Sequence, residues 1–499
     1  MTDPAPDLEL LRATLALDAA DPTPLHRQLY QQLRDLVLEG RLASGARIPP
    51  SRQLAQSLGV SRNTVVSAFD QLTAEGFLSA RVGEGTRVAQ AILGQSPRVD
   101  SRNQPARRLS ARGEALSEPR RSLPAPGERE IFQPGLPDTT DFPNTSWARI
   151  LSRRARSLSH DLTAYGHAGG FGPLRESLSA YLTGSRGLRC RPEQVLVCTS
   201  AQAAVDLAVR LLTDTGDGAW REAPGYVGAQ VSFAATGLRV TGIPVDEHGV
   251  DADRVDALPK DEKPRVGYIT PSHHFPIGYT LSLSRRLQLL EWSERVGGWI
   301  IEDDYDSEFR YANAPIAAVQ GLALDTRVVY IGSFAKTLFP GLRVAYLVVP
   351  IGLALAFRQA IRQSGQEPAL LLQAALHDFL ELGHFARHVR TMRQRYAERH
   401  RQMIEATRKH LQPWGMPIEA DGGLQLTFAF DPQAHPGIDD RTLVSRTKRA
   451  GFGVEPLSRY GPPPETPGGL VFGIGTPGSD PIDETVERLA NVMAQPERD

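Results

Sequence analysis

The run GSFAKTLFPGLRVAY (residues 332–346) decides the fold, because it places a lysine just beyond a strand-like segment. The segment RVVYIGS ends at Ser333, Lys336 follows three residues later, and Arg343 comes after a Phe-Pro-Gly turn. A desolvated lysine in a crevice at the carboxyl end of a parallel sheet loses its proton and forms a Schiff base with an aldehyde. Ser333 and Arg343 suit a phosphate. Taken alone, Lys336 is equally consistent with a surface cation.

Residues 131–495 alternate strand-like runs with amphipathic helices, which predicts the α/β class. The runs VLVCTS, RVGYIT, GWIIEDD and RVVYIGS are almost continuous in apolar residues. Such runs are typical of parallel strands that helices cover on both faces. The sequence therefore predicts a mostly parallel sheet that carries functional side chains at its carboxyl edge.

Three further segments supply what pyridoxal phosphate needs at such an edge. GWIIEDD ends in acids that can face a pyridine nitrogen, EAPGY supplies an aromatic ring, and TSAQ begins a helix whose N–H groups suit a phosphate. Each segment alone has an ordinary explanation as a helix cap, a loop residue or a helix start. Their order along the chain is what favours a cofactor site.

In that order, with YGHAGGFGPLRESLSAYL before them and TPSHHFPIG between them, residues 131–495 resemble the fold type I aminotransferases, which have a large mostly parallel-sheet subdomain and a smaller α/β subdomain. The resemblance implies an obligate homodimer and the cofactor pyridoxal 5'-phosphate. It implies that Lys336 forms the internal aldimine, that Asp303 pairs with the pyridine nitrogen and that Tyr305 binds the ring hydroxyl. Tyr226 would stack on the ring, and Tyr165 would reach the phosphate of the partner subunit. The residues implied to bind the phosphate are Ser200, Ala201, Gln202, Ser333 and Arg343.

The chain departs from that family at two places. HHFPIG stands where aminotransferases carry Asn-Pro-Thr-Gly, and we expect His274 to replace the asparagine as a donor to the cofactor. Val471, in GLVFGIG, stands where a transaminase presents an arginine to the substrate carboxylate. Arg459 is the nearest candidate for an effector carboxylate, and an exposed loop arginine is its alternative. No residue is assigned a catalytic role.

Residues 22–90 carry a helix-turn-helix pattern. Ser51 caps a short helix, Gly59 makes the turn, and Ser61 caps a second helix that starts Arg-Asn-Thr. A Gly-rich hairpin follows, so the segment resembles the GntR-type winged helix rather than a generic helical hairpin. The resemblance implies that this domain binds double-stranded DNA through Arg52, Arg62, Asn63 and Thr64, with Gly83 at the wing tip.

Residues 91–130 are rich in Arg, Ser and Pro and poor in large apolar residues, which predicts a flexible linker. With this linker between them, the two modules resemble the MocR-family regulators along almost the whole chain. The segment GHFARHVRTMRQRYAERH (residues 383–400) also resembles that family's long helix. Its His384 and His388 have the spacing of a zinc pair, but no third ligand follows, and we expect no metal site.

The net charge of −1 excludes a polycation, so any contact with nucleic acid requires a local basic patch. Two cysteines, no signal peptide and no long apolar run predict a cytoplasmic protein without a membrane segment.

Three functions fit the sequence: a regulator that senses pyridoxal phosphate alone or with an amino compound, an active aminotransferase with an appended DNA-binding domain, and a cofactor-binding scaffold whose winged helix contacts proteins. The first is preferred, with vitamin B6 or amine metabolism as the regulated process. Its expected partners are a DNA operator, a small-molecule effector and a second copy of the chain, with the winged helix of one copy near the effector domain of the other.

Overall fold

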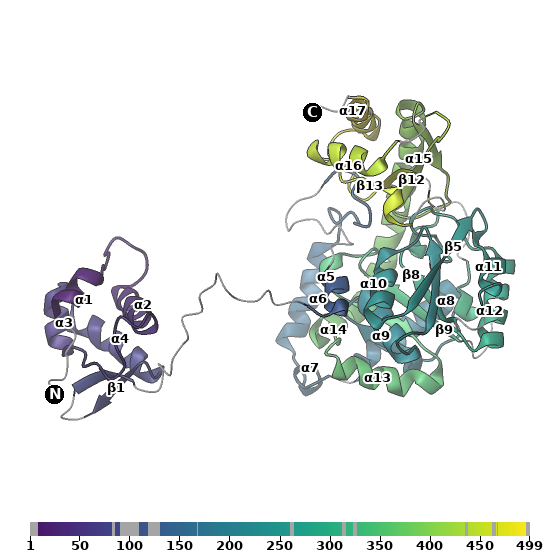
Figure 1. Ribbon diagram of the computed structural model, residues 1–499. Coiled ribbons are helices and arrows are strands. Elements are labelled where there is room, and N and C mark those ends of the chain that lie inside the picture. The colour runs from purple at the N-terminus through teal and green to yellow at the C-terminus, as the bar shows by residue number, and fades with distance from the viewer. Residues whose placement is uncertain are drawn as a thin grey trace. The chain divides into compact units, whose positions relative to one another are not determined.

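The computed structural model describes residues 8–81, 85–89, 109–117, 130–166, 168–259, 264–311, 316–322, 327–434, 438–461, 466 and 468–495. The chain divides into two compact units, Met1–Arg108 and Leu109–Asp499, each with its own hydrophobic core (Figure 1). Within the described residues no helix is both long and apolar enough to cross a membrane.

The smaller unit is a helical domain closed by a hairpin. Its elements are α1 (Leu8–Thr14), α2 (Leu25–Leu38), α3 (Ser51–Leu58), α4 (Arg62–Ala74), β1 (Leu78–Arg81) and β2 (Gly85–Val88). β1 and β2 pair in antiparallel fashion, and Leu29, Leu54 and Val65 are fully buried between the helices. Leu11 and Leu15 join this core, although they precede residue 22, where the sequence analysis places the start of the domain.

The turn between α3 and α4 follows from its residues. Gly59 ends α3 with a φ of 68°, which is the left-handed region that glycine adopts without strain. Ser61 then caps α4, where its hydroxyl accepts a hydrogen bond from the Thr64 N–H at 3.1 Å. The predicted helix-turn-helix and its hairpin are therefore confirmed.

The larger unit is built on an eight-stranded sheet with the strand order β3-β10-β9-β8-β7-β4-β5-β6. Strands β4, β5, β7, β8 and β9 run parallel, whereas β10 is antiparallel to both β3 and β9. The bounds are β3 (Val195–Cys198), β4 (Gly218–Ala223), β5 (Arg239–Asp246), β6 (Gly249–Val250), β7 (Pro264–Ile269), β8 (Trp299–Asp304), β9 (Val328–Ser333) and β10 (Ala345–Val348). The predicted, mostly parallel α/β sheet is confirmed.

Helices cover both faces of this sheet (Figure 1), which explains why its strands are continuous in apolar residues. In β9, Val329 and Ile331 pack with α9 (Ala201–Leu212), α10 (Val227–Thr236) and α13 (Ala354–Gln363). On the opposite face, Val328 and Tyr330 meet other helices. Those helices are α6 (Asn144–Arg156), α8 (Gly172–Arg186), α11 (Ala252–Asp256), α12 (Leu283–Val296) and α14 (Leu370–Glu381); the short α7 (His160–Thr163) follows α6.

A smaller subdomain completes the larger unit. Its sheet has the order β11-β12-β14-β13, from β11 (Gly415–Ile418), β12 (Gln425–Phe430), β13 (Glu455–Pro456) and β14 (Gly469–Gly473), and all its pairs are antiparallel. It packs against α15 (His384–His410), α16 (Asp440–Arg449) and α17 (Ile482–Ala494). The 27-residue α15 contains residues 384–400 of the segment that the sequence analysis singles out, and Gly383 is its N-cap.

One helix lies inside the segment 91–130. It is α5 (Ala111–Ser117), which contacts α10 of the larger unit. The rest of that segment, apart from residues 109, 110 and 130, lies outside the described residues.

Candidate functional site

The predicted lysine lies at the carboxyl edge of the parallel strands. β8 and β9 are neighbours with Asp303 paired to Ile331, so the residues after both strands emerge side by side. The Lys336 Nζ donates a hydrogen bond to the Gly135 carbonyl oxygen. Gly135 has a φ of 79°, and a Cβ there would lie 3.2 Å from Nζ, so the segment before α6 packs directly on the lysine.

Asp303 is a buried carboxylate with one unsatisfied oxygen. Its Oδ2 accepts a hydrogen bond from the Tyr268 hydroxyl at 2.6 Å, whereas Oδ1 has no hydrogen-bond partner among the described residues. Burial raises the pKa of Asp303 to about 6, and the charge of Lys336 acts in the opposite direction. A buried acceptor without a donor is costly, so this position favours a ligand that brings a proton.

Aromatic rings surround the same edge. The Tyr226 ring is stacked with the Tyr268 ring at 6.1 Å between centroids, and the Phe275 ring meets both Tyr226 and Tyr305 edge-on at 6.0 and 5.9 Å. The Tyr226 hydroxyl also donates to Gln202 Oε1 at 3.2 Å. Two of the predicted residues, Tyr226 and Gln202, are therefore joined directly.

The Tyr305 hydroxyl is held by residues that the sequence analysis missed. Gln425 Nε2 donates to its oxygen at 2.5 Å, and His273 Nδ1 lies 2.9 Å from the same atom. His273 Nδ1 is also 3.2 Å from Asp306 Oδ2, which can only accept, so the proton of His273 sits on Nδ1. Gln425 and the Nδ1–H of His273, which is shared between Tyr305 and Asp306, leave the proton of Tyr305 available to an oxygen of a bound ring.

The neighbouring His274 is oriented differently. Its Nε2 lies 3.1 Å from the Pro224 carbonyl oxygen, which accepts, so Nε2 carries the proton and Nδ1 is left without a partner in the described part of the chain. Burial lowers the pKa of His274 to about 3 and keeps the ring neutral. His274 therefore donates its proton to a backbone carbonyl, and the histidine that contacts the Tyr305 hydroxyl is His273.

The beginning of α9 offers a phosphate site. The Ser200 hydroxyl accepts a hydrogen bond from the Ala203 N–H at 3.1 Å, which leaves the N–H groups of Ala201 and Gln202 without an intrahelical partner. The Ser333 hydroxyl accepts from the Ala335 N–H at 3.1 Å.

Three more residues predicted for the cofactor or effector site are Tyr165, Arg343 and Arg459. Arg343 is exposed, with a φ of 54°, and Tyr165 is fully exposed at 101% of its reference area. Arg459 Nη1 lies 3.8 Å from Glu455 Oε1. A tyrosine as exposed as Tyr165 suits contact with a second subunit.

The residues at this edge fit pyridoxal phosphate. The orphaned Asp303 Oδ1 suits a protonated pyridine nitrogen, the first-turn N–H groups of α9 suit the phosphate, and Lys336 supplies a primary amine. When bound, that group supplies an aldehyde that reacts with amines. Asp303 would hold its ring nitrogen and Tyr305 its ring oxygen.

The candidate DNA-binding residues lie around the start of α4. Arg62 and Asn63 are exposed in its first turn, Thr64 is half-buried, and Arg52 is exposed on α3. Arg47 adds another exposed guanidinium near the turn end of the hairpin, where its Nε lies 3.3 Å from the position of a Cβ on Gly85. Gly83 lies outside the described residues.

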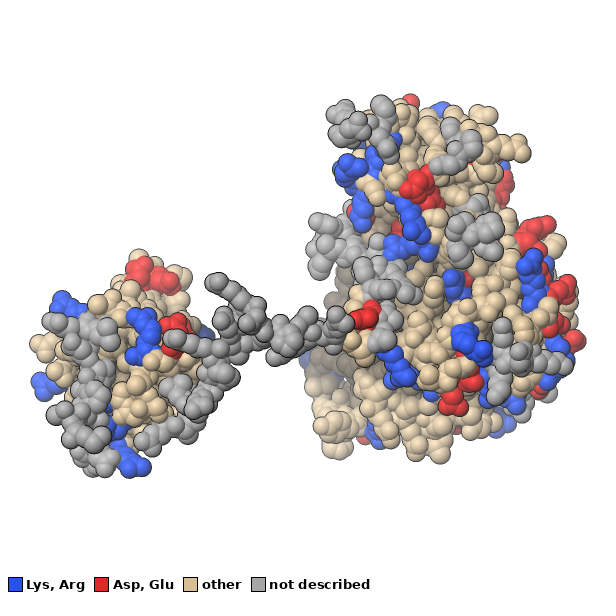
Figure 2. Space-filling view, in the orientation of Figure 1, with Lys and Arg blue, Asp and Glu red and all other residues tan. Residues whose placement is uncertain are grey.

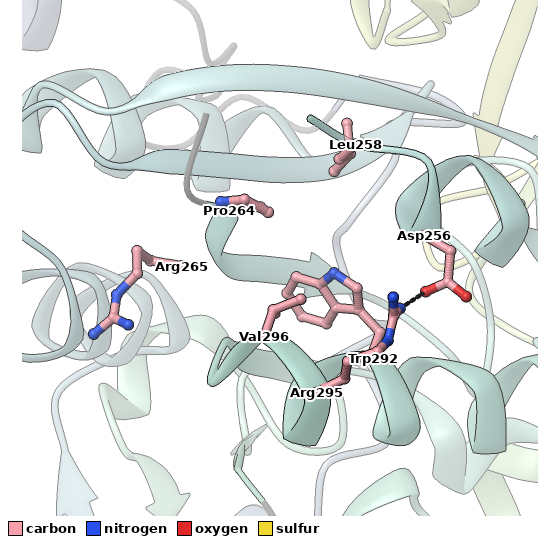
Figure 3. Close-up of a pocket in the computed structure, with 7 residues that line it drawn as sticks. All are labelled: Asp256, Leu258, Pro264, Arg265, Trp292, Arg295 and Val296. Atoms are coloured by element: carbon pink, nitrogen blue, oxygen red, sulfur yellow. Dashed lines mark hydrogen bonds and ion pairs between the residues drawn. The ribbon is translucent and has the colours of Figure 1, made fainter. Parts of the chain in front are cut away.

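Other surface features lie elsewhere. A cavity at the amino-terminal end of β7 is lined by Pro264, Trp292 and Arg295, and Arg295 is paired with Asp256 at 2.5 Å (Figure 3). It lies at the opposite strand ends from Asp303 and Lys336. Figure 2 shows basic and acidic side chains interspersed over the visible face of the larger unit, not gathered in one patch. The described residues contain no cluster of three or more His, Cys, Asp or Glu side chains suited to a metal ion.

Comparisons with known proteins match both units. Residues 25–88 match the family "Bacterial regulatory proteins, gntR family", and residues 137–433 match "Aminotransferase class I and II". The probable rhizopine catabolism regulatory protein MocR of Rhizobium meliloti is 41% identical over 94% of this chain and 93% of that protein. The pyridoxine biosynthesis transcriptional regulator PdxR of Corynebacterium glutamicum is 31% identical over 96% of this chain and 98% of that protein.

Solved aminotransferases share the fold of the larger unit. The α-aminoadipate aminotransferase LysN of Thermus thermophilus, solved with N-(5'-phosphopyridoxyl)-L-leucine, is 28% identical with a TM-score of 0.66 over 73% of this chain and 91% of that one. The kynurenine aminotransferase of Pyrococcus horikoshii is 25% identical with a TM-score of 0.67 over the same shares.

These matches define a class: a GntR-type DNA-binding regulator whose larger part has the fold of the class I and II aminotransferases. Within that class, the chain belongs to the MocR family of transcriptional regulators.

Proposed function

We propose that this regulator attaches pyridoxal 5'-phosphate to Lys336 and uses the attached group, alone or with an amino compound, to control DNA binding by its winged helix. The observation that carries the proposal is that Lys336 and the buried Oδ1 of Asp303, which has no hydrogen-bond partner among the described residues, stand at the same edge of the sheet. The assignments of Tyr226, Tyr305, Ser200, Ala201, Gln202, Ser333 and Arg343 to the cofactor belong to the same proposal.

The physical requirement for control is that the ligand binds two arrangements of the molecule with different affinities. His273 and Gln425 offer a route for such a difference, because Gln425 belongs to β12 of the smaller subdomain and contacts Tyr305 of the larger one. A ligand at Tyr305 therefore acts on a contact between the two subdomains. We propose a homodimer as the functional form, with Tyr165 facing the partner subunit and the winged helix of one copy near the effector domain of the other.

The working aminotransferase is less well supported. Val471 is a fully buried valine in β14, packed with Leu457 and Tyr460, at the place where we expect a transaminase arginine. The wall beside the ring is therefore apolar, and turnover of ordinary amino acids has no carboxylate partner at that position.

DNA binding in the presence and absence of pyridoxal phosphate tests the proposal. We expect the affinity of the full-length protein for the region upstream of its own gene to change when the cofactor is added at low salt. A protein that binds no such fragment would favour the scaffold, and steady multiple turnover of a common amino acid would favour the enzyme.

A further inference from the structure

One side of the ring site is an apolar wall made of Val227, Phe275, Leu457, Tyr460 and Val471. The wall adjoins the ring site directly, because the Phe275 ring contacts those of Tyr226, Tyr305 and Tyr460 edge-on at 6.0, 5.9 and 5.1 Å. Leu457 and Val471 are completely buried in it.

Two arginines lie beside this wall, and acceptors of the protein engage both. Arg221 Nη1 donates to the carbonyl oxygens of Glu222 and Tyr460 at 2.7 and 3.3 Å, and its Nη2 donates to Gln230 Oε1 at 3.1 Å. Arg459 faces Glu455 at 3.8 Å, and the other Glu455 oxygen accepts a hydrogen bond from the Tyr460 hydroxyl. Neither guanidinium is presented to the ring site by this arrangement.

Two buried acids, Asp303 and Asp306, stand on the other side of the ring site and are 5% and 1% exposed. Neither offers a positive charge to a ligand carboxylate.

These features discriminate between amines. In an α-amino acid, the carboxylate is attached to the carbon that bears the amine. Against this wall that carboxylate would lose its bound water, and no arginine would replace the water with a pair of hydrogen bonds. An apolar or aromatic body would instead gain contact area with the half-buried ring of Phe275.

We propose that the effector is a primary amine with an aromatic or apolar body and no carboxylate. This inference rests on the proposed attachment of pyridoxal phosphate at Lys336, because that group supplies the aldehyde with which amines react. The amino compound of the proposed function is then an amine of this class, and Arg459 stays paired with Glu455 when it binds.

Matched pairs of amines and their parent amino acids test the proposal on the full-length, cofactor-loaded protein. Tyramine is compared with tyrosine and phenethylamine with phenylalanine, by the change in visible absorbance and by the change in DNA affinity. We expect each amine to act at a concentration about tenfold or more below that of its amino acid. Equal potency of the two, or a response to the amino acids alone, would overturn the inference.

Variants at Val471 and Arg459 test whether the missing arginine is what weakens the response to amino acids. Val471→Arg should raise the response to phenylalanine, whereas Val471→Met, which adds size without charge, should not. Arg459→Gln should leave the ratio of amine to amino-acid potency unchanged, and this measurement remains informative if Val471→Arg does not fold. A selective loss of the amino-acid response in Arg459→Gln would identify Arg459 as a carboxylate partner and overturn the proposal.

Two measurements, the visible absorbance and the DNA affinity, show whether the inference about amines fails or the proposed function fails. If the loaded protein has no visible absorbance, or no DNA affinity that depends on the cofactor, the proposed function itself fails. If both are present and only the amines are inactive, the proposed function stands and the inference is wrong.

Discussion

The Nδ1 atom of His273 lies 2.9 Å from the hydroxyl oxygen of Tyr305, and the ring of that histidine packs closely against Gly423 of the smaller subdomain. The carboxylate of Asp306 joins the two subdomains at the same place, because its Oδ2 accepts the Leu424 N–H at 3.1 Å. The hydroxyl of Tyr305, the histidine and the loop before β12 are thereby coupled.

Replacing each of the two adjacent histidines tests which one supports the ring oxygen. In His273→Ala, Tyr305 loses a donor, and we expect pyridoxal phosphate to bind about tenfold more weakly, as the loss of one hydrogen bond implies. The pH at which the visible absorbance changes should shift as well. Absorbance titration measures both quantities.

His274→Ala is the comparison, because His274 Nε2 is directed at the Pro224 carbonyl. Its effect on the pH of the absorbance change should be smaller. If His274→Ala moves that pH and His273→Ala does not, His274 is the donor that the sequence analysis expects.

A glycine pair isolates the crowding at His273. A Cβ on Gly423 would lie 1.8 Å from His273 Cε1, whereas nothing lies within 4 Å of a Cβ on Gly451, and their φ values are 88° and 86°. Both alanine variants carry the same backbone strain, about 1 kcal/mol. Gly423→Ala should cost a further ~1–3 kcal/mol in unfolding free energy through overpacking and should weaken cofactor binding. Denaturant unfolding of the two variants gives the difference, and equal losses would contradict the described contact.

Glu222 makes the stability of the cofactor-free protein depend on pH. Burial raises its pKa from 4.5 to about 8, although Thr270 donates to it twice. Because the folded pKa lies above the unfolded one, its contribution is full below about pH 4.5 and is lost as the pH rises through about 8. Glu222→Gln keeps an acceptor for Thr270 and removes the titration. The melting temperature of the variant should fall less between about pH 6 and about pH 9 than that of the original chain. Parallel curves would exclude Glu222 as the source.

Arg62→Ala tests the helix-turn-helix. If Arg62 contacts a base, the variant should lose ~1–3 kcal/mol of specific DNA binding. Arg27, an exposed arginine of α2 outside the helix-turn-helix, gives the matched variant Arg27→Ala, which should lose less. Titration of operator and unrelated DNA at two salt concentrations separates the specific loss from a general one. An unchanged operator titration would remove Arg62 from the recognition surface.

The order of motifs along the chain was enough to predict the fold and the residues at the strand ends, because parallel strands bring their carboxyl ends to one edge. Asp303, Tyr305 and Lys336 each follow an apolar run that marks such an end. The contact of Gln425 with Tyr305 was not predictable in this way. The two residues are 120 positions apart, in different subdomains, and no local pattern links them.

The adjacent histidines show a second limit of the sequence. Both belong to the same run, and only the structure shows that one faces a tyrosine and the other a backbone carbonyl. Similarly, Leu11 and Leu15 lie in a short segment before residue 22, and their burial depends on the helices that they pack against.

Cofactor attachment at Lys336 is the central claim, and Lys336→Ala tests it most directly. Purified full-length protein is incubated with pyridoxal phosphate and dialysed, and its visible absorbance and far-ultraviolet circular dichroism are recorded beside those of Lys448→Ala, an exposed lysine of α16. We predict that Lys336→Ala retains the fold and loses the absorbance, whereas Lys448→Ala retains both. A folded Lys336→Ala protein that keeps the visible absorbance after dialysis would contradict the assignment.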